Sequence, residues 1–244
     1  MEEQHTTTVG ASADPSALMK QMFEVGAQYG YKRSRRHPSV APFIYGVKNQ
    51  VEIFDLERTA ELLAAPLAFV AKIAGEGKKI LFVGTKHEAQ EAVRELASFI
   101  DMPWVCVRWI GGTLTNFPEI RSRVARLEEL RGQRESGDLA AKYTKKERLL
   151  IDHEINRLEK NFSGIISMKE KPAALFVVDP GKEHTAVKEA RQLGIPVIGL
   201  ASSDCDIRGI EFPLVANDSS RASIFFFMQH IVNAYRKGRS EKPL

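Results

Sequence analysis

Two side chains in this sequence could carry acid–base catalysis. Asp179 and His184 follow an apolar run, AALFVV, which predicts a buried strand. The carboxyl ends of such strands are where open α/β sheets hold ligands and reacting groups. Thr85 follows a second apolar run, KILFV, and would lie at the same edge. One hypothesis is therefore a flavodoxin-like enzyme or small-molecule binder that uses these three side chains.

Other catalytic patterns are absent from the sequence. It contains no GxSxG, no GxGxxG and no GxxxxGK[ST] segment, so Gly84-Thr85-Lys86 reads more simply as a tight turn in which Thr85 caps a helix. Cys205 stands between Asp204 and Asp206, which would raise the pKa of its thiol. The histidines lack metal-type spacing. We therefore expect no catalytic residue, no metal and no cofactor.

Basic residues gather in a loop near the N-terminus. Arg33, Arg35, Arg36 and His37 form this group, and Tyr29, Tyr31, Phe43 and Tyr45 flank it. Cations interleaved with aromatic rings suit phosphate contacts combined with stacking on exposed bases. Lys48 lies in a nearby turn and would add another phosphate contact. This favours RNA over the alternative, a solvated charge run beside core aromatics.

Composition limits the protein class. The net charge of +4 over 244 residues and the pI of about 9.0 are compatible with a polyanionic partner. Cys106 and Cys205 form neither a CxxC pair nor a disulfide framework, which favours a reducing cytoplasm. No signal-peptide pattern and no apolar run of membrane-spanning length is visible. We expect a cytoplasmic protein with no membrane partner and no small-molecule substrate.

Apolar strands alternate with amphipathic helices along most of the chain, which is typical of a parallel sheet covered on both faces. We expect strands at 43–47, 51–54, 79–83, 104–107, 173–178, 196–200 and 212–215. We expect helices at 16–25, 56–74, 86–99, 183–193 and 219–236. The segment 26–42 is expected to be a loop. The predicted fold is a doubly wound, mostly parallel α/β sheet of roughly five strands, of flavodoxin or Rossmann type.

Residues 114–162 interrupt this alternation. Apolar residues at helical spacing predict two helices, each with one narrow apolar seam: Ile120, Val124, Leu127 and Leu130, then Ile151, Ile155, Leu158 and Phe162. A polar link at 132–144 would join them as a projecting antiparallel coiled-coil hairpin. The expected organisation is a flexible tail at 1–15, one α/β domain formed by 16–113 and 163–238, the hairpin insertion at 114–162, and a flexible tail at 239–244.

The stretch 108–117 (RWIGGTLTNF) resembles the signature of the bacterial small ribosomal subunit protein S-two family. Further segments resemble the family in order: 35–38, 43–46, 80–86, 158–165, 172–180, 183–184, 189–190 and 194–196. The resemblance extends from about Met19 to Gly238. It implies a doubly wound α/β domain with an inserted coiled-coil hairpin, and a structural, non-catalytic role.

The resemblance also implies the partners. These are 16S ribosomal RNA on the solvent side of the small subunit near the head–body junction, neighbouring ribosomal proteins and, in some bacteria, ribosomal protein S-one. The RNA-binding candidates are then Arg33, Arg35, Arg36, His37, Lys48, Arg108, Thr113, Thr115, Asn116, Arg121, Arg123, Lys145 and Lys146. Trp109, Leu114 and Phe117 are expected to pack instead.

Three segments depart from the family pattern. The usual Gly-His is Gly30-Tyr31 here, which puts any role of that histidine, metal ligation included, in doubt. Ser202-Ser203-Asp204 and 215–218 (VAND) replace the common Asp-Thr-Asn and Pro-Gly-Asn-Asp, so we expect the second loop to differ in shape. A ribosomal role predicts a filled crevice at the strand ends, whereas an enzyme predicts a polar pocket there. A protein-only scaffold, with the hairpin docking a partner helix, is a third alternative.

Overall fold

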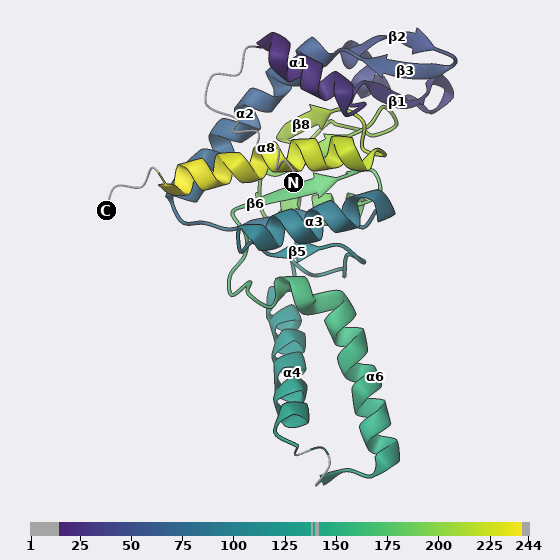
Figure 1. Cartoon of the computed structure of the whole chain (residues 1–244). Coiled ribbons are helices and arrows are strands. Elements are labelled where there is room, and N and C mark those ends of the chain that lie inside the picture. The colour runs from purple at the N-terminus through teal and green to yellow at the C-terminus, as the bar shows by residue number, and fades with distance from the viewer. Residues whose placement is uncertain (1–14, 138, 140–141, 241–244) are drawn as a thin grey trace, which may run out of the picture.

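A computed structural model describes residues 15–137, 139 and 142–240 (Figure 1). The expected tails at 1–15 and 239–244 lie outside these residues, except at their inner ends. Pro15 begins α1 (Pro15–Glu24), and α8 (Arg221–Ser240) continues to Ser240.

A five-stranded parallel sheet forms the centre of the protein. Its strands are β4 (Ile80–Val83), β5 (Trp104–Val105), β6 (Ala174–Val178), β7 (Val197–Ala201) and β8 (Phe212–Val215). They follow the order β5-β4-β6-β7-β8, and all neighbouring pairs are parallel. The chain starts inside the sheet, moves to one edge and returns to build the other, as in flavodoxin-type doubly wound sheets. The predicted parallel α/β fold is confirmed.

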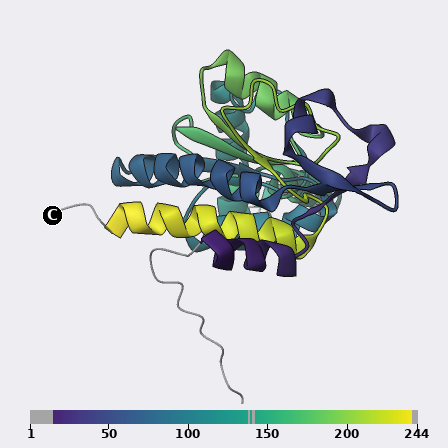
Figure 2. The same ribbon diagram turned by 90° about the horizontal axis from the view of Figure 1, so that it is seen from above.

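Helices lie on both faces of this sheet. Ile80 and Phe82 of β4 join one core with α2 (Leu56–Gly75), α3 (His87–Phe99) and α8. The alternate residues of β4 join a second core with α7 (His184–Gln192). β4, β6 and β7 are therefore apolar throughout, as strands buried on both faces must be. α8 runs alongside α2 (Figure 2), where a side chain at Gly238 would overlap the Ala71 carbonyl.

A second, antiparallel sheet lies beside the first and corrects one expectation. The segment 26–42, predicted to be a loop, contains β1 (Tyr29–Lys32) and two 3-10 turns, Arg33–Arg35 and Pro38–Phe43. β1 pairs with β3 (Val51–Phe54), which also pairs with β2 (Ile44–Lys48). The strand was missed because its only hydrogen-bonded neighbour is about twenty residues away, and nothing local in the sequence reveals that pairing.

Two long helices make up most of the described part of the insertion between β5 and β6. α4 (Phe117–Glu135) and α6 (Lys145–Phe162) extend side by side away from the sheet (Figure 1). Their predicted seams are buried except at Ile151, which is half-buried. α4 continues into the predicted link, and a capping box of Thr144 and Glu147 begins α6. Of the helices that the structure describes, none has the length and apolar character needed to span a bilayer.

Candidate functional site

The carboxyl ends of the central strands converge on one lysine. Lys86 Nζ lies 3.0 Å from Asp179 Oδ2 and 2.9 Å from Asp218 Oδ1. It also donates hydrogen bonds to the Tyr31 hydroxyl at 3.1 Å and to Ser219 Oγ at 3.3 Å. The Asp218 side chain is only 1% exposed. The crevice where the enzyme hypothesis places a pocket is thus occupied by an ion-paired network, which we call the Lys86 cluster.

Two of the three side chains of the enzyme hypothesis, Asp179 and Thr85, are bound by other side chains of the protein. Asp179 pairs with Lys86, and no hydrogen bond or ion pair among the described residues joins it to His184. The backbone N–H and hydroxyl of Thr85 both donate to Glu183 Oε1. The expectation that Thr85 caps the next helix is therefore wrong, because a buried carboxylate from another strand end binds this side chain instead.

Burial governs the charge states at the strand ends. Burial lowers the pKa of Lys86, but Asp218 and Asp179 outweigh this effect and the pKa is raised overall. Burial, aided by the Asp179 charge and opposed by Lys86, raises the pKa of Asp218 to about 6. Burial and the Asp179 charge raise the pKa of the Cys205 thiol to about 12, which agrees with its expected poor nucleophilicity.

The raised pKa of Asp218 predicts a pH-dependent stability. Its ordinary value is 3.8, so between about pH 6 and 4 the folded protein binds a proton that the unfolded chain does not. Protonation there favours the folded state. Relative to Asp218→Asn, we expect the wild type to gain about 2 kcal/mol of unfolding free energy as the pH falls from 7.5 to 4.5. Urea denaturation at each pH measures this, and parallel curves for the two proteins would contradict it.

The segment from Tyr31 to His37, which we call the basic loop, is held against the carboxyl ends of the central strands by backbone hydrogen bonds. The Tyr31 N–H donates to Ser203 Oγ and the His37 N–H donates to the Ser203 carbonyl, both at 2.8 Å. Gly30 allows this close approach, because a Cβ would lie only 3.0 Å from Ser203 Oγ and 3.1 Å from the Phe54 ring. Ser203, one of the departures from the family pattern, therefore helps to hold the loop in place.

The predicted cations of this region differ in whether a carboxylate of the protein pairs with them. Arg35 pairs with Asp204 at 2.8 Å and lies over the Tyr31 ring, 4.5 Å from its centroid. Arg36 Nη1 lies 3.4 Å from Glu52 Oε1, whose side chain is 0% exposed. Burial raises the pKa of Glu52 and Arg36 opposes that shift, so Arg36 compensates a buried charge. Two further candidates, Arg33 and Lys48, are exposed and make no ion pair with the described residues.

The stretch 108–117, which we call the signature loop, is held together by the carboxylate of Glu189, a residue that the sequence analysis did not identify. Glu189 of α7 is 7% exposed. It accepts hydrogen bonds from Trp109 Nε1 at 3.0 Å and from the backbone N–H groups of Gly112, Leu114 and Thr115 at 2.8, 3.0 and 3.1 Å. The Thr115 hydroxyl donates a fifth at 3.1 Å. Burial raises the pKa of Glu189, but these hydrogen bonds together lower it below its ordinary value.

Some of the predicted residues of the signature loop are buried and others are exposed to solvent. Thr113 is buried and its hydroxyl donates to the Ile110 carbonyl at 2.6 Å, so its side chain lies inside the loop in the free protein. Trp109 and Leu114 are buried and Phe117 is half-buried, as expected for packing. The Arg108 and Asn116 side chains are exposed.

The hairpin candidates lie at both of its ends. Arg121 Nη1 donates to the carbonyls of Ile166 and Met168 at 3.2 and 3.3 Å, which fastens the root of α4 to the domain. Arg123 pairs with Glu119 on the helix surface. Lys145 and Lys146 are exposed at the start of α6, at the tip (Figure 1). The structure therefore does not gather the candidates into one patch, because the tip lies at the opposite end of the molecule from β1–β3.

Fold and site together define a class. The protein is an α/β scaffold whose strand ends are occupied by its own side chains and whose predicted RNA-contact cations include exposed residues of the N-terminal basic segment and of the hairpin. That organisation favours a binding protein over an enzyme, because Lys86 and Glu183 already engage Asp179 and Thr85, two of the three side chains of the enzyme hypothesis.

Comparison with known proteins specifies the family. Residues 22–238 match the family described as ribosomal protein S2. The chain is 40% identical over 224 residues to small ribosomal subunit protein uS2 of Rhodopirellula baltica, covering 92% of this chain and 86% of the relative. It is 41% identical over 221 residues to uS2 of Coprothermobacter proteolyticus (91% and 82% covered) and 40% identical over 210 residues to uS2 of Dichelobacter nodosus (86% and 78% covered).

The chain belongs to the ribosomal protein S2 family. The resemblance found in the signature loop is thereby confirmed. Members of this family are structural proteins of the cytoplasmic ribosome and not enzymes, which decides between the ribosomal and the enzyme hypotheses.

Proposed function

We propose that this protein is a structural constituent of the small ribosomal subunit that binds 16S ribosomal RNA on the solvent side, near the head–body junction, and serves translation without catalysis. The observation that carries the proposal is the family match over residues 22–238. Its protein partners are neighbouring ribosomal proteins and, in some bacteria, ribosomal protein S-one. Exposed cations on two separate parts of the molecule support an extended contact with folded RNA.

The proposed RNA contacts are the exposed members of the predicted set, apart from Arg36 and Thr115, whose side chains bind the buried carboxylates of Glu52 and Glu189. They are Arg33, Arg35, Lys48, Arg108, Asn116, Arg123, Lys145 and Lys146. Arg36, His37, Thr115 and Arg121 make contacts within the protein that hold these groups in position. The mechanism is neutralisation of phosphates combined with a fit to the shape of folded RNA, because side chains cannot read base edges in the deep, narrow major groove of an RNA helix.

The domain organisation belongs to the same proposal. We infer one α/β domain formed by 16–113 and 163–238, with 114–162 as an inserted antiparallel coiled coil. The buried seam residues Ile120, Val124, Leu127 and Leu130 support this, since they repeat at intervals of four and three. At the root, a side chain at Gly164 would overlap Trp104, so the return from the hairpin needs glycine there. A projecting arm fixed at its root could reach RNA that the domain does not touch.

Removal of two unpaired cations tests the RNA contact. We expect Arg33→Ala combined with Lys48→Ala to weaken binding to 16S ribosomal RNA fragments, measured with and without neighbouring small-subunit proteins. The slope of log affinity against log salt should become shallower by about 2, since each lost phosphate contact removes about one unit. Filter binding across a salt titration measures both quantities. Arg36 is a poor probe, because its removal leaves Glu52 buried and unpaired.

Lys237→Ala with Arg239→Ala is the matched control. Both side chains are exposed in the last turn of α8, so this variant loses the same charge away from the basic loop. Equal losses in both variants would mean that net charge alone drives binding. If neither RNA nor partly assembled subunits bound the wild-type protein, the proposed function would be wrong.

A further inference from the structure

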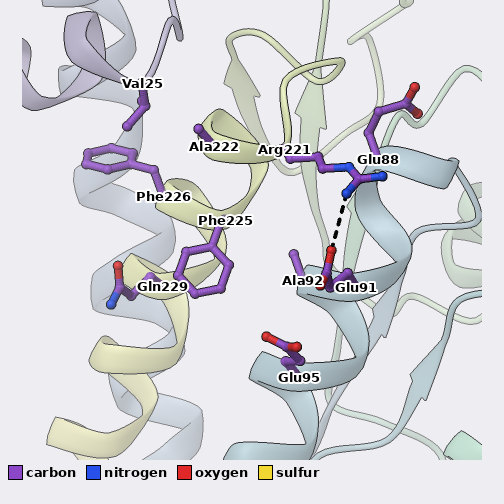
Figure 3. Close-up of a pocket in the computed structure, with 10 residues that line it drawn as sticks. All are labelled: Val25, Glu88, Glu91, Ala92, Glu95, Arg221, Ala222, Phe225, Phe226 and Gln229. Atoms are coloured by element: carbon purple, nitrogen blue, oxygen red, sulfur yellow. Dashed lines mark ion pairs between the residues drawn. The ribbon is translucent and has the colours of Figure 1, made fainter.

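A groove of about 470 Å³ lies between α3 and α8 (Figure 3). α8 lines it with Arg221, Phe225 and Gln229, and α3 lines it with Glu88, Glu91 and Glu95. Ala92 contributes apolar surface between these walls, and Phe226 lines the groove from the side of α8 that faces Val25 (Figure 3). Phe225 remains 38% exposed although it lies within the groove. The groove therefore offers an uncovered aromatic ring beside a wall of carboxylates.

The wall formed by the three glutamates is negatively charged, whereas the protein as a whole is positively charged. The chain carries a net charge of +4, yet the three glutamates share one face of α3 at intervals of three and four residues. Like charges at these intervals destabilise a helix. Glu88 is compensated by its place in the first turn, and Glu91 pairs with Arg221 at 3.5 Å. Glu95 has no ion pair among the described residues, so the stability of α3 does not account for the full set.

These features exclude one occupant and favour another. Phosphates would be repelled by three neighbouring carboxylates, so RNA does not fit this face. A peptide segment with lysine or arginine side chains could pair with the glutamates. An apolar side chain of the same segment could cover Phe225 and Ala92. Both requirements are met by a basic protein segment that has an apolar anchor.

We propose that the groove between α3 and α8 docks a lysine- or arginine-rich, apolar-anchored segment of a neighbouring protein in the assembled subunit. The proposal rests on the proposed function, since proteins that share an RNA scaffold carry such basic segments to neutralise phosphates. It assigns this face to protein contact, whereas the basic loop and the hairpin contact RNA.

Photo-crosslinking from the groove tests the proposal. Gln229→p-benzoylphenylalanine is incorporated into the full chain, small subunits that contain it are isolated and irradiated, and the crosslinked segment is mapped by mass spectrometry. We expect a crosslink to a protein segment that carries several Lys or Arg residues and an apolar residue. The same label at Glu61, exposed on α2, is the control. A crosslink to RNA, to a second copy of this chain or to an acidic segment would overturn the proposal, as would no crosslink in subunits that hold the protein.

Neutral variants test the role of the charges. Glu91→Gln with Glu95→Gln, combined with the label, should lower the crosslink yield about 5- to 10-fold, whereas Glu61→Gln with Glu170→Gln should leave it unchanged. An unchanged yield in the first variant would overturn the charge argument. Cosedimentation with the subunit reports the proposed function separately, because absence of the wild-type protein from subunits would count against that function.

Discussion

Glu189→Ala is expected to lower the free energy of unfolding by about 4 kcal/mol, as one of the two largest effects of a single substitution in this protein. The change leaves the Trp109 indole N–H and three backbone N–H groups of the signature loop without their acceptor. Each buried donor without a partner costs about 1–3 kcal/mol, offset in part by the carboxylate burial that the variant avoids. Urea denaturation at pH 7.5, followed by circular dichroism, measures the loss.

Two comparisons isolate the role of this carboxylate. Lys188→Ala changes the exposed neighbour on the same helix and should cost less than about 0.5 kcal/mol. The pKa of Glu189 is lowered, so its contribution is present above the ordinary value of 4.5 and is lost as the pH falls through the folded-state value. The gap between wild type and Glu189→Ala should therefore narrow in acid. A gap as small as that of Lys188→Ala would show that the loop does not depend on Glu189.

Lys86→Met is expected to cost about 3–5 kcal/mol at pH 7.5. Methionine fills similar space but leaves two carboxylates without their shared cation. Asp218 is almost fully buried and cannot recover solvation, so its pKa should rise further above about 6 and the residue should fold as the neutral acid. The loss should be smaller at pH 5 than at pH 7.5, since less deprotonated Asp218 must then be buried. Denaturation curves at the two pH values measure this difference.

The same substitution should loosen the basic loop. Tyr31 accepts a hydrogen bond from Lys86, and the loop continues from Tyr31 to the arginines. We expect faster hydrogen exchange at the Tyr31 and His37 amides in Lys86→Met. Lys182→Met, which removes an exposed lysine three residues after Asp179, should leave exchange and stability unchanged. Equal effects of both substitutions would indicate general electrostatics and would contradict a specific role for the Lys86 cluster.

Most of the fold was predictable because it depends on local patterns. Strands such as β4 and β6 are continuous apolar runs, and a run of that length between turn residues has few alternatives to a buried strand. The hairpin was predictable because each of its helices carries one seam of apolar residues at helical spacing. Packing the two seams against each other removes these side chains from water. The family resemblance required only the order of short motifs, which the chain carries in its primary structure.

The site was predictable only in part. The sequence indicated which side chains carry charge. It could not distinguish Arg33, which makes no ion pair with the described residues, from Arg36, which compensates the buried Glu52. Glu189 had one local signal, since it lies on the apolar face of its helix, three residues after Ala186. A glutamate at such a position requires donors, and the sequence does not say which donors the fold supplies.

Sequence alone determined the class of fold, the inserted helices, the family and the stock of cations available for RNA. Tertiary structure alone decided that Lys86 would meet Asp218, 132 residues away, and that Glu189 would meet Trp109, 80 residues away. The physical reason is that hydrophobic periodicity is a local property, whereas a buried charge is stable only beside a partner that folding brings to it.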